Sequence, residues 1–185
     1  MLGTAASIDT KYKGQQYVIE AIALLEKQGY EIEYKLAGGR NGSSNEENHL
    51  VSKARSLGIM DKITFCGSLS KDDMNDYYDS LDIYIQPSKQ EGLPRSVIEA
   101  MSHACPVLGS NIAGIPELID KECLFEKGNV KSITEHIISL VNSDLCKYAK
   151  NNFIRSKDYV YTILEEKRNI FYTQFIMDNG LDKHT

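Results

Sequence analysis

The sequence has no long apolar run. No window approaches the ~18 consecutive apolar residues of a membrane-spanning helix, although 42% of the 185 residues are hydrophobic. The amino terminus also lacks the basic stretch and following apolar run of a secretory signal peptide. We therefore expect no transmembrane segment, no signal peptide and a cytoplasmic location.

Positive charge is also in short supply. Lys and Arg number 21 against 26 Asp and Glu, which gives a formal net charge of -5 at pH 7. Proteins that bind nucleic acid neutralise its phosphates with clustered Lys and Arg. The acidic balance therefore argues against nucleic acid as a partner.

Cysteine is sparse, and its spacing is not that of a metal site. The four cysteines form no Cys-x-x-Cys pair and have no His at a zinc-ligand spacing; they are Cys66, Cys105, Cys123 and Cys146. An Asp-x-Asp cluster is also missing, and Asp72-Asp73 is typical of the first turn of a helix. We therefore expect reduced thiols, no bound metal and no cofactor.

A Gly-x-Gly-x-x-Gly motif after the first strand, which a dinucleotide-binding dehydrogenase needs, is missing as well. What the sequence contains is short apolar strands that alternate with amphipathic helices, a pattern typical of an α/β domain. A length of 185 residues is enough for one domain with its own core. We predict a single parallel sheet of about six strands with helices on both faces.

The expected elements follow one another along the whole chain. Strands are predicted near the amino terminus and at 32–37, 63–67, 83–85, 106–110 and 123–125. Helices are predicted from Gln15, over 46–57, after an N-cap at Ser70, from Pro94, and over 130–141, with terminal helices at about 144–178.

The stretch from Gln86 to Ser110 is the most informative part of the chain. An apolar strand runs into a loop with Glu91 and Gly92, and the loop runs into a helix that Pro94 is suited to begin. The free N–H groups at such a helix start suit a phosphate. Glu91 and Glu99 bracket this anion site, although Glu99 taken alone has the position of a solvated helix glutamate.

This stretch resembles the signature of retaining glycosyltransferases of the two-domain, twin-Rossmann type, called GT-B, in particular family 4 or group 1. The residues that match it in order are Glu91, Gly92, Leu93, Pro94, Glu99, Ala100, Pro106, Val107, Ser110, Gly114 and Glu117. The likeness extends from about Gly3 to Tyr172. A whole enzyme of this type would be about twice as long, so the resemblance implies that residues 1–185 are its carboxyl-terminal, nucleotide-sugar-binding Rossmann-like half.

The resemblance also implies roles for individual residues. Lys13 would grip the donor diphosphate, Glu91 would lie against the donor sugar, and Glu99 would accept hydrogen bonds from the ribose hydroxyls. Backbone contacts to the donor are implied for four places. They are Gly92 with the helix start at Leu93, Pro94, Arg95 and Ser96, the loop at Gly38 and Gly39, the loop at Gly67, and the sugar-facing loop at Gly114. The family usually has an Arg where this chain has Ala5, Ala6 and Ser7, which leaves open whether Lys11 substitutes.

The implied activity is transfer of a sugar from a nucleotide-diphosphate donor to an acceptor hydroxyl, with retention of configuration and without a metal. The groups that bind the acceptor would belong to an amino-terminal domain absent from this sequence, so we expect weak donor binding and no transfer by this chain alone. Aromatic residues of the terminal helices are expected to cover a sheet face or that missing domain, and their exposure could cause self-association.

Two alternatives stay open. One is another GT-B activity, such as a nucleotide-sugar epimerase or a phosphorylase, although no clear lysine for a phosphorylase cofactor is present. A second is a catalytically inert binding or scaffolding module, which the replacement of the usual Arg favours. By family association, bacterial polysaccharide assembly and a parent enzyme at the inner membrane face are consistent with the sequence.

Overall fold

Six parallel strands form one sheet at the centre of the protein, in the order β3-β2-β1-β4-β5-β6. The structure is a computed structural model, and it describes residues 1–39 and 45–180. The strands are β1 (Leu2–Ala5), β2 (Tyr34–Ala37), β3 (Ile63–Gly67), β4 (Ile83–Gln86), β5 (Val107–Ser110) and β6 (Leu124–Phe125). The predicted α/β fold with about six parallel strands is confirmed.

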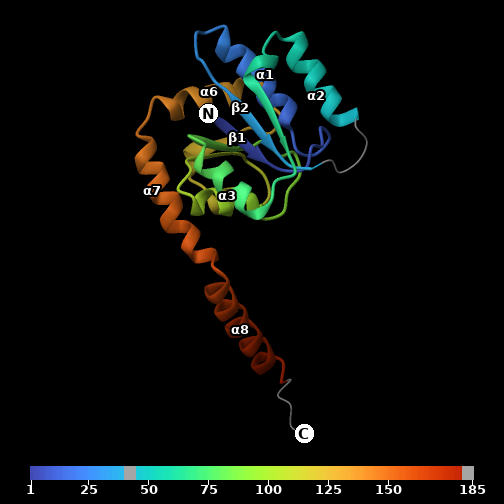
Figure 1. The fold of residues 1–185 in the computed structure, drawn as a ribbon. Coiled ribbons are helices and arrows are strands. Elements are labelled where there is room, and N and C mark those ends of the chain that lie inside the picture. Colours follow the sequence, from blue (N-terminus) through green and yellow to red (C-terminus); the bar gives the residue numbers. More distant parts are fainter. Residues whose placement is uncertain (40–44, 181–185) are drawn as a thin grey trace.

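Helices cover both faces of the sheet, as predicted (Figure 1). On one face lie α1 (Gln15–Glu26), α2 (Asn45–Ser56) and α6 (Val130–Val141), with α1 in contact with the other two. On the other face lie α3 (Lys71–Asp79), α4 (Arg95–Ser102) and α7 (Leu145–Ser156), with α4 packed against α7. The short α5 (Ile115–Leu118) and three 3-10 helices, η1 (Met60–Lys62), η2 (Lys121–Cys123) and η3 (Lys157–Tyr159), connect these elements.

The strand order reverses direction at the centre of the sheet. From β1 the chain moves outward through β2 to β3, then returns across the sheet so that β4 pairs with the other side of β1. Because all pairings are parallel, the carboxyl ends of β1 and β4 lie side by side at one edge, and the loops that leave them diverge. This reversal positions the candidate site.

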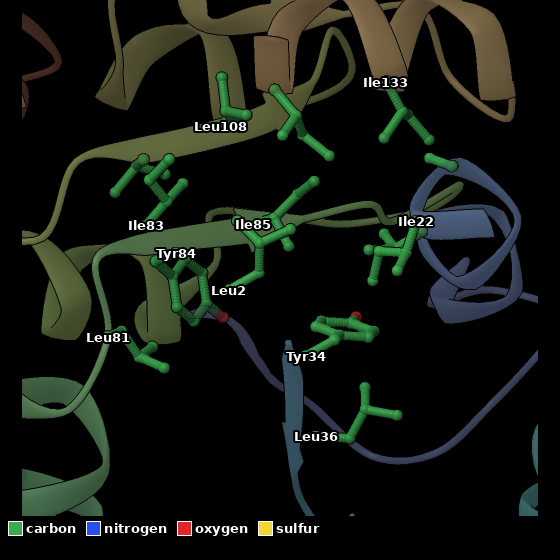
Figure 2. Packing of buried hydrophobic residues seen from close by; sticks show 14 of the residues in the cluster. Leu2, Ile22, Tyr34, Leu36, Leu81, Ile83, Tyr84, Ile85, Leu108 and Ile133 are labelled. Carbon is green, nitrogen blue, oxygen red and sulfur yellow. The ribbon is translucent and has the colours of Figure 1, made fainter. Parts of the chain in front are cut away.

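The core fills the space between the central strands and both helical layers. All four residues of β4 are buried, and Ile133 of α6 lies on the opposite side of this strand from Leu81 and the ring of Tyr84 (Figure 2). Two buried hydroxyls at the centre of the sheet are paired, as such groups generally are: Tyr34 Oη donates to Thr4 Oγ1 at 2.7 Å, and Thr4 Oγ1 donates to the Ile85 carbonyl at 2.6 Å.

Several predicted boundaries are shifted by local hydrogen bonding. The strand predicted over 32–37 begins at Tyr34, because its partner β1 starts at Leu2, which pairs with Tyr34. The helix predicted from Pro94 begins at Arg95, with Pro94 as the residue before it in an extended conformation. The N-cap prediction at Ser70 is confirmed by a capping box in which Ser70 and Asp73 each accept from the other's backbone N–H.

The last helix, α8 (Tyr161–Asp178), projects away from the rest of the protein (Figure 1). None of its residues is buried, and large apolar side chains such as Tyr161, Ile170, Phe171 and Met177 are more than half exposed. The prediction that this segment covers a sheet face is therefore wrong, while contact with a second domain stays a prediction. In the parts of the chain that the structure describes, no helix is both long enough and apolar enough to cross a membrane.

Candidate functional site

A cleft lies at the carboxyl ends of β1 and β4, where the strand order reverses. In open α/β sheets this switch point is the usual place for a ligand. The cleft, which we call the central cleft, measures about 480 Å³ and is lined by Ala5, Ala6, Ser7, Lys13, Gln86, Glu91, Pro94, Arg95, Ser96 and Glu99. The two carboxylates of the sequence motif thus line one shared hollow.

Two further hollows continue the central cleft towards β2 and β3. The first, of about 360 Å³, shares five residues with the central cleft and extends along Ala37, Gly38, Gly39, Ser68, Leu69, Met74 and Tyr78. The second, of about 390 Å³, is lined by Gly38, Gly39, Glu47, Phe65, Gly67 and Ser68. The loops that follow four neighbouring strands therefore border one continuous groove.

Glu91 is held through one of its two carboxylate oxygens. Its Oε2 accepts hydrogen bonds from Lys13 Nζ at 2.8 Å, from Ser88 Oγ at 2.8 Å and from Gln86 Nε2 at 3.4 Å. No described residue donates to its other oxygen, Oε1. An ionised carboxylate can accept on both oxygens, so Glu91 is fixed in place and keeps an acceptor free for a ligand.

Gln86 is a site residue that the sequence analysis missed. It is buried at the end of β4, and its Oε1 accepts hydrogen bonds from Tyr84 Oη at 2.7 Å and from Ser96 Oγ at 3.3 Å. Its Nε2 donates to Ser88 Oγ at 2.8 Å. One amide thus ties the strand, the loop and the first turn of α4 together. The signal available in the sequence was a polar residue at the end of an otherwise apolar strand.

Glu99 lies one helical turn after Ser96, and it is exposed at the cleft. Its Oε2 accepts a hydrogen bond of 2.9 Å from Tyr78 Oη, a contact between α4 and α3. Tyr78 is buried in the helix layer, and it also orients this carboxylate. Burial, the nearby Tyr84 and the Glu99 carboxylate raise the pKa of Tyr78 well above its ordinary value, so its hydroxyl stays protonated and acts as a donor.

The start of α4 presents backbone N–H groups to the central cleft. Pro94 has no N–H, so the donors predicted over Leu93–Ser96 cannot include this residue. The N–H of Val97 donates to the Pro94 carbonyl at 3.2 Å. Arg95 and Ser96 are the first two residues of α4, so no carbonyl of the helix lies one turn earlier to accept from their N–H groups. The donors at this helix start are therefore the N–H groups of Arg95 and Ser96.

The predicted glycines fall into two groups. Gly38, Gly39 and Gly67 line the groove, and a Cβ on Gly38 would lie 1.9 Å from the Ala6 carbonyl oxygen, so this glycine lets two loops pack closely. Gly92 and Gly114 are not among the described residues that line the cleft or its two extensions, nor is Leu93. The Gly114 N–H donates to the Gly92 carbonyl at 3.1 Å, which joins their two loops.

No group of three or more His, Cys, Asp or Glu side chains is placed to hold a metal ion within residues 1–39 and 45–180. His103, on the turn after α4, interacts through Nδ1 with Asp79 Oδ1 at 2.7 Å. This pair lies on the helix layer, outside the lining of the central cleft.

The sequence from residue 6 to residue 156 matches the family model of glycosyl transferases group 1. This chain belongs to that family. The match covers most of the chain, so the resemblance carried by the 86–117 window is confirmed. From here we call the chain the group 1 domain.

The group 1 domain has bacterial relatives that it matches over about nine tenths of its length. Protein CapJ of Staphylococcus aureus is 32% identical over 171 residues, which cover 91% of this chain and 39% of CapJ. The O-antigen biosynthesis glycosyltransferase WclY of Escherichia coli is 27% identical over 90% of this chain and 42% of its own length. The group 1 domain thus spans less than half the length of these relatives.

Solved structures share the fold of the group 1 domain. The Anabaena protein HepE, crystallised with UDP, matches with a TM-score of 0.80 at 20% identity over 94% of this chain and 48% of HepE. The carboxyl-terminal domain of a group 1 glycosyl transferase, LpcC from Francisella tularensis, matches with a TM-score of 0.77 at 24% identity over 86% of both chains. These likenesses show the GT-B half-fold.

The group 1 domain differs from the family pattern on the β1 side of the central cleft. Ala5, Ala6 and Ser7 line the cleft there, where the family usually has an Arg. Lys11 does not replace it: this residue is exposed, does not line the central cleft, and its Nζ lies 4.8 Å from the centre of the Tyr12 ring. The charged side chains of the cleft are therefore Lys13, Glu91, Arg95 and Glu99.

Proposed function

We propose that the group 1 domain binds the nucleotide-diphosphate-sugar donor of a retaining glycosyltransferase that transfers a glycosyl group to an acceptor hydroxyl. The observation that carries this proposal is that Glu91 and Glu99 line one cleft at the switch point, beside the start of α4. The complexes of HepE with UDP and with UDP-glucose support a nucleotide sugar as the ligand class.

In this proposal, different residues of the groove bind different parts of the donor. Oε1 of Glu91 accepts from the donor sugar, and Glu99 accepts from the ribose hydroxyls. The N–H groups of Arg95 and Ser96, together with Lys13, stabilise the negative charge that develops on the leaving diphosphate. The loops at Gly38, Gly39 and Gly67 border the nucleobase, while Gly92, Leu93 and Gly114 shape the loops near the sugar. This mechanism needs no metal ion and no cofactor.

The acceptor would be bound by a second domain of the same protein. The group 1 domain covers 39% of CapJ and 48% of HepE, so a chain of that length has room for another domain of similar size. We expect the group 1 domain alone to bind the donor weakly and to transfer nothing. Glycosylation of an acceptor by this chain alone, at the rate of a complete enzyme, would contradict this.

The first test is a titration of UDP, GDP, ADP and their glucose conjugates by isothermal calorimetry. We expect selective binding of one base, weakened about tenfold in Glu99→Gln, because an ionised acceptor contributes more than a neutral amide to a hydrogen bond. Glu31→Gln is the matched control, since Glu31 is exposed at the start of the segment leading to β2. Equal affinity of Glu99→Gln and wild type, or no nucleotide binding at all, would contradict the proposal.

An inert nucleotide-binding module is the second candidate, because the cleft lacks the usual Arg of the family. The same titration does not separate it from the transferase, since both bind nucleotide. A transfer assay with the group 1 domain joined to its amino-terminal domain separates the two candidates. The transferase proposal expects product from the wild-type protein and loss of product in Glu91→Gln.

A further inference from the structure

A buried primary amide, that of Gln86, lies at the wall of the central cleft, with 1% of the residue's surface exposed. Burial of an amide is costly unless its polar atoms are paired. Its Oε1 accepts from Tyr84 Oη and from Ser96 Oγ. Its Nε2 donates to Ser88 Oγ and, at 3.4 Å, to Glu91 Oε2. All four hydrogen-bonding positions of the amide are therefore used.

The orientation of this amide is fixed from both sides. Tyr84 Oη accepts from the Ala5 N–H at 3.2 Å. Burial raises the pKa of Tyr84 above its ordinary value, so the hydroxyl stays protonated and donates to the amide oxygen at 2.7 Å. On the other side, a reversed amide would place its oxygen against a carboxylate oxygen of Glu91, and neither could donate. The N–H groups of Gln86 therefore face Ser88 and Glu91.

Ser88 connects the amide to Glu91. Ser88 is fully buried, and its hydroxyl accepts from Gln86 Nε2 at 2.8 Å, so its single proton is donated to Glu91 Oε2 at 2.8 Å. Lys13 Nζ donates to the same oxygen. Because these donors all bind Oε2, the direction in which the other oxygen of Glu91 points depends on the position of the Gln86 amide.

We infer that Gln86 is the positioning residue of Glu91, and that it determines how much the donor sugar adds to the affinity for the nucleotide. The inference rests on the proposed function, because it assigns the donor sugar to Oε1 of Glu91. Gln86 also accepts from Ser96 in the first turn of α4. One buried amide thus fixes the acceptor for the sugar relative to the helix start proposed for the diphosphate, and a sugar nucleotide contacts both.

The test measures the sugar increment, which is the affinity for a sugar nucleotide divided by the affinity for its diphosphate alone. UDP-glucose, UDP-galactose, UDP-N-acetylglucosamine, ADP-glucose and GDP-mannose are titrated into wild type by calorimetry, together with UDP, ADP and GDP. The sugar nucleotide with the largest increment is kept. In Gln86→Met we expect its increment to fall about threefold to tenfold, with a smaller change in the affinity for the diphosphate.

Gln86→Met should fold, because methionine has a similar length and Tyr84 Oη keeps the Ala5 carbonyl, 3.3 Å away, as an acceptor. Ser88→Ala breaks the same connection to Glu91 at its middle, and it should also lower the increment; it decides the test if Gln86→Met does not fold. A wild-type increment in either folded variant overturns the inference.

Tyr34→Phe is the matched control. It also removes a buried hydrogen bond of the sheet, the one to Thr4 Oγ1, but Tyr34 is outside the lining of the central cleft. We expect it to leave the sugar increment unchanged. An equal fall in Tyr34→Phe and Gln86→Met would mean that Gln86 acts through stability, which overturns the inference.

A Glu91→Gln background separates positioning from direct contact with the donor. Gln86→Met should change the increment there by less than about twofold, because both substitutions act through the same carboxylate. A further full loss overturns the inference. If wild type binds a diphosphate but none of the five sugars adds affinity, the inference fails while nucleotide binding stands. If wild type binds none of the three diphosphates, the proposed function fails as well.

Discussion

The hydroxyl of Tyr78 connects the packing of the helix layer to the chemistry of the cleft. Its ring packs against Tyr77, Tyr84 and His103, with centroids 5.3 to 6.0 Å apart. Its Oη donates to Glu99 Oε2. Because burial keeps this hydroxyl protonated, the Glu99 carboxylate always has one donor. The packed Tyr78 ring thereby fixes the orientation of the carboxylate and of its remaining acceptor positions.

We predict that Tyr78→Phe reduces the preference for ribose over deoxyribose. The substitution removes one hydroxyl and little volume, so Glu99 loses its donor and turns more freely. The ratio of the affinities for UDP and 2′-deoxy-UDP, or for the matching pair of the preferred base, should fall by about threefold to tenfold. Calorimetric titration of both nucleotides provides this ratio.

Tyr77→Phe is the control for that experiment. Tyr77 lies next to Tyr78 on α3, and its Oη donates to the Lys35 carbonyl at 3.0 Å, away from Glu99. Both variants lose one largely buried hydrogen bond, worth about 1 kcal/mol of stability. If both change the ribose preference equally, Tyr78 acts through stability and not through Glu99.

The loops that carry Lys13 and Glu91 pack backbone against backbone. The N–H of Lys89 donates to the Tyr12 carbonyl at 2.7 Å, and a Cβ on Gly14 would lie 2.1 Å from the Pro87 carbonyl oxygen. Gly14 also has a φ of 70°, in the left-handed region, directly before α1. The loop that follows β1 can therefore approach the loop that follows β4 only with a glycine at this position.

Gly14→Ala should destabilise the protein more than Gly58→Ala does. Gly58 has a φ of 74° after α2 but has no atom within 4 Å of an added Cβ, so its substitution costs only the left-handed backbone, about 1–2 kcal/mol. Gly14→Ala has the same backbone cost and a clash with backbone, and we expect at least about 2 kcal/mol more. Urea unfolding of both variants measures the difference, and equal losses would show that the two loops can separate freely.

At the scale of the whole molecule, α7 and α8 behave differently although they are consecutive. Asn152 Nδ2 of α7 donates to the Cys105 carbonyl at 2.9 Å, and Arg155 bonds to both the Leu118 carbonyl and Asp120. These bonds attach α7 to the layer that carries α4. The next helix, α8, has exposed apolar side chains along its length and no buried residue.

Removing residues 161–185 should leave the fold intact. We expect the 1–160 chain to keep the Tm of the full chain within about 2 °C, because no buried residue of α8 is lost. It should also be monomeric at concentrations where the full chain self-associates through its exposed aromatic residues. Differential scanning calorimetry and sedimentation velocity measure the two properties.

The 1–144 chain, which lacks α7 as well, is the comparison. It loses three hydrogen bonds and the packing of α7 on α4, so its Tm should fall by about 10 °C or more. A similar drop on removal of residues 161–185 alone would mean that α8 supports the domain. Unchanged self-association of the 1–160 chain would place the contact elsewhere on the surface.

Much of the fold and the general position of the site could be predicted from local patterns. Alternating apolar segments, the N-cap at Ser70 and the motif around Glu91 and Glu99 are properties of short stretches. The structure confirms the parallel α/β sheet that they predicted, and the match to the family model confirms the family. Element ends were less accurate, as at Tyr34 and Arg95, because a strand begins where a neighbouring strand can pair with it.

By itself the sequence determined the order of the strands and helices, the family and the residues that gather at one edge of the sheet. Only the tertiary structure decided the partner of each charged or polar group: Lys13 pairs with Glu91 across 78 residues of chain, Tyr78 with Glu99, and Arg95 with no described residue. The physical reason is that secondary structure depends on neighbours within a turn or two, whereas an ion pair or a hydrogen bond depends on which distant loops the sheet brings within 3 Å of each other.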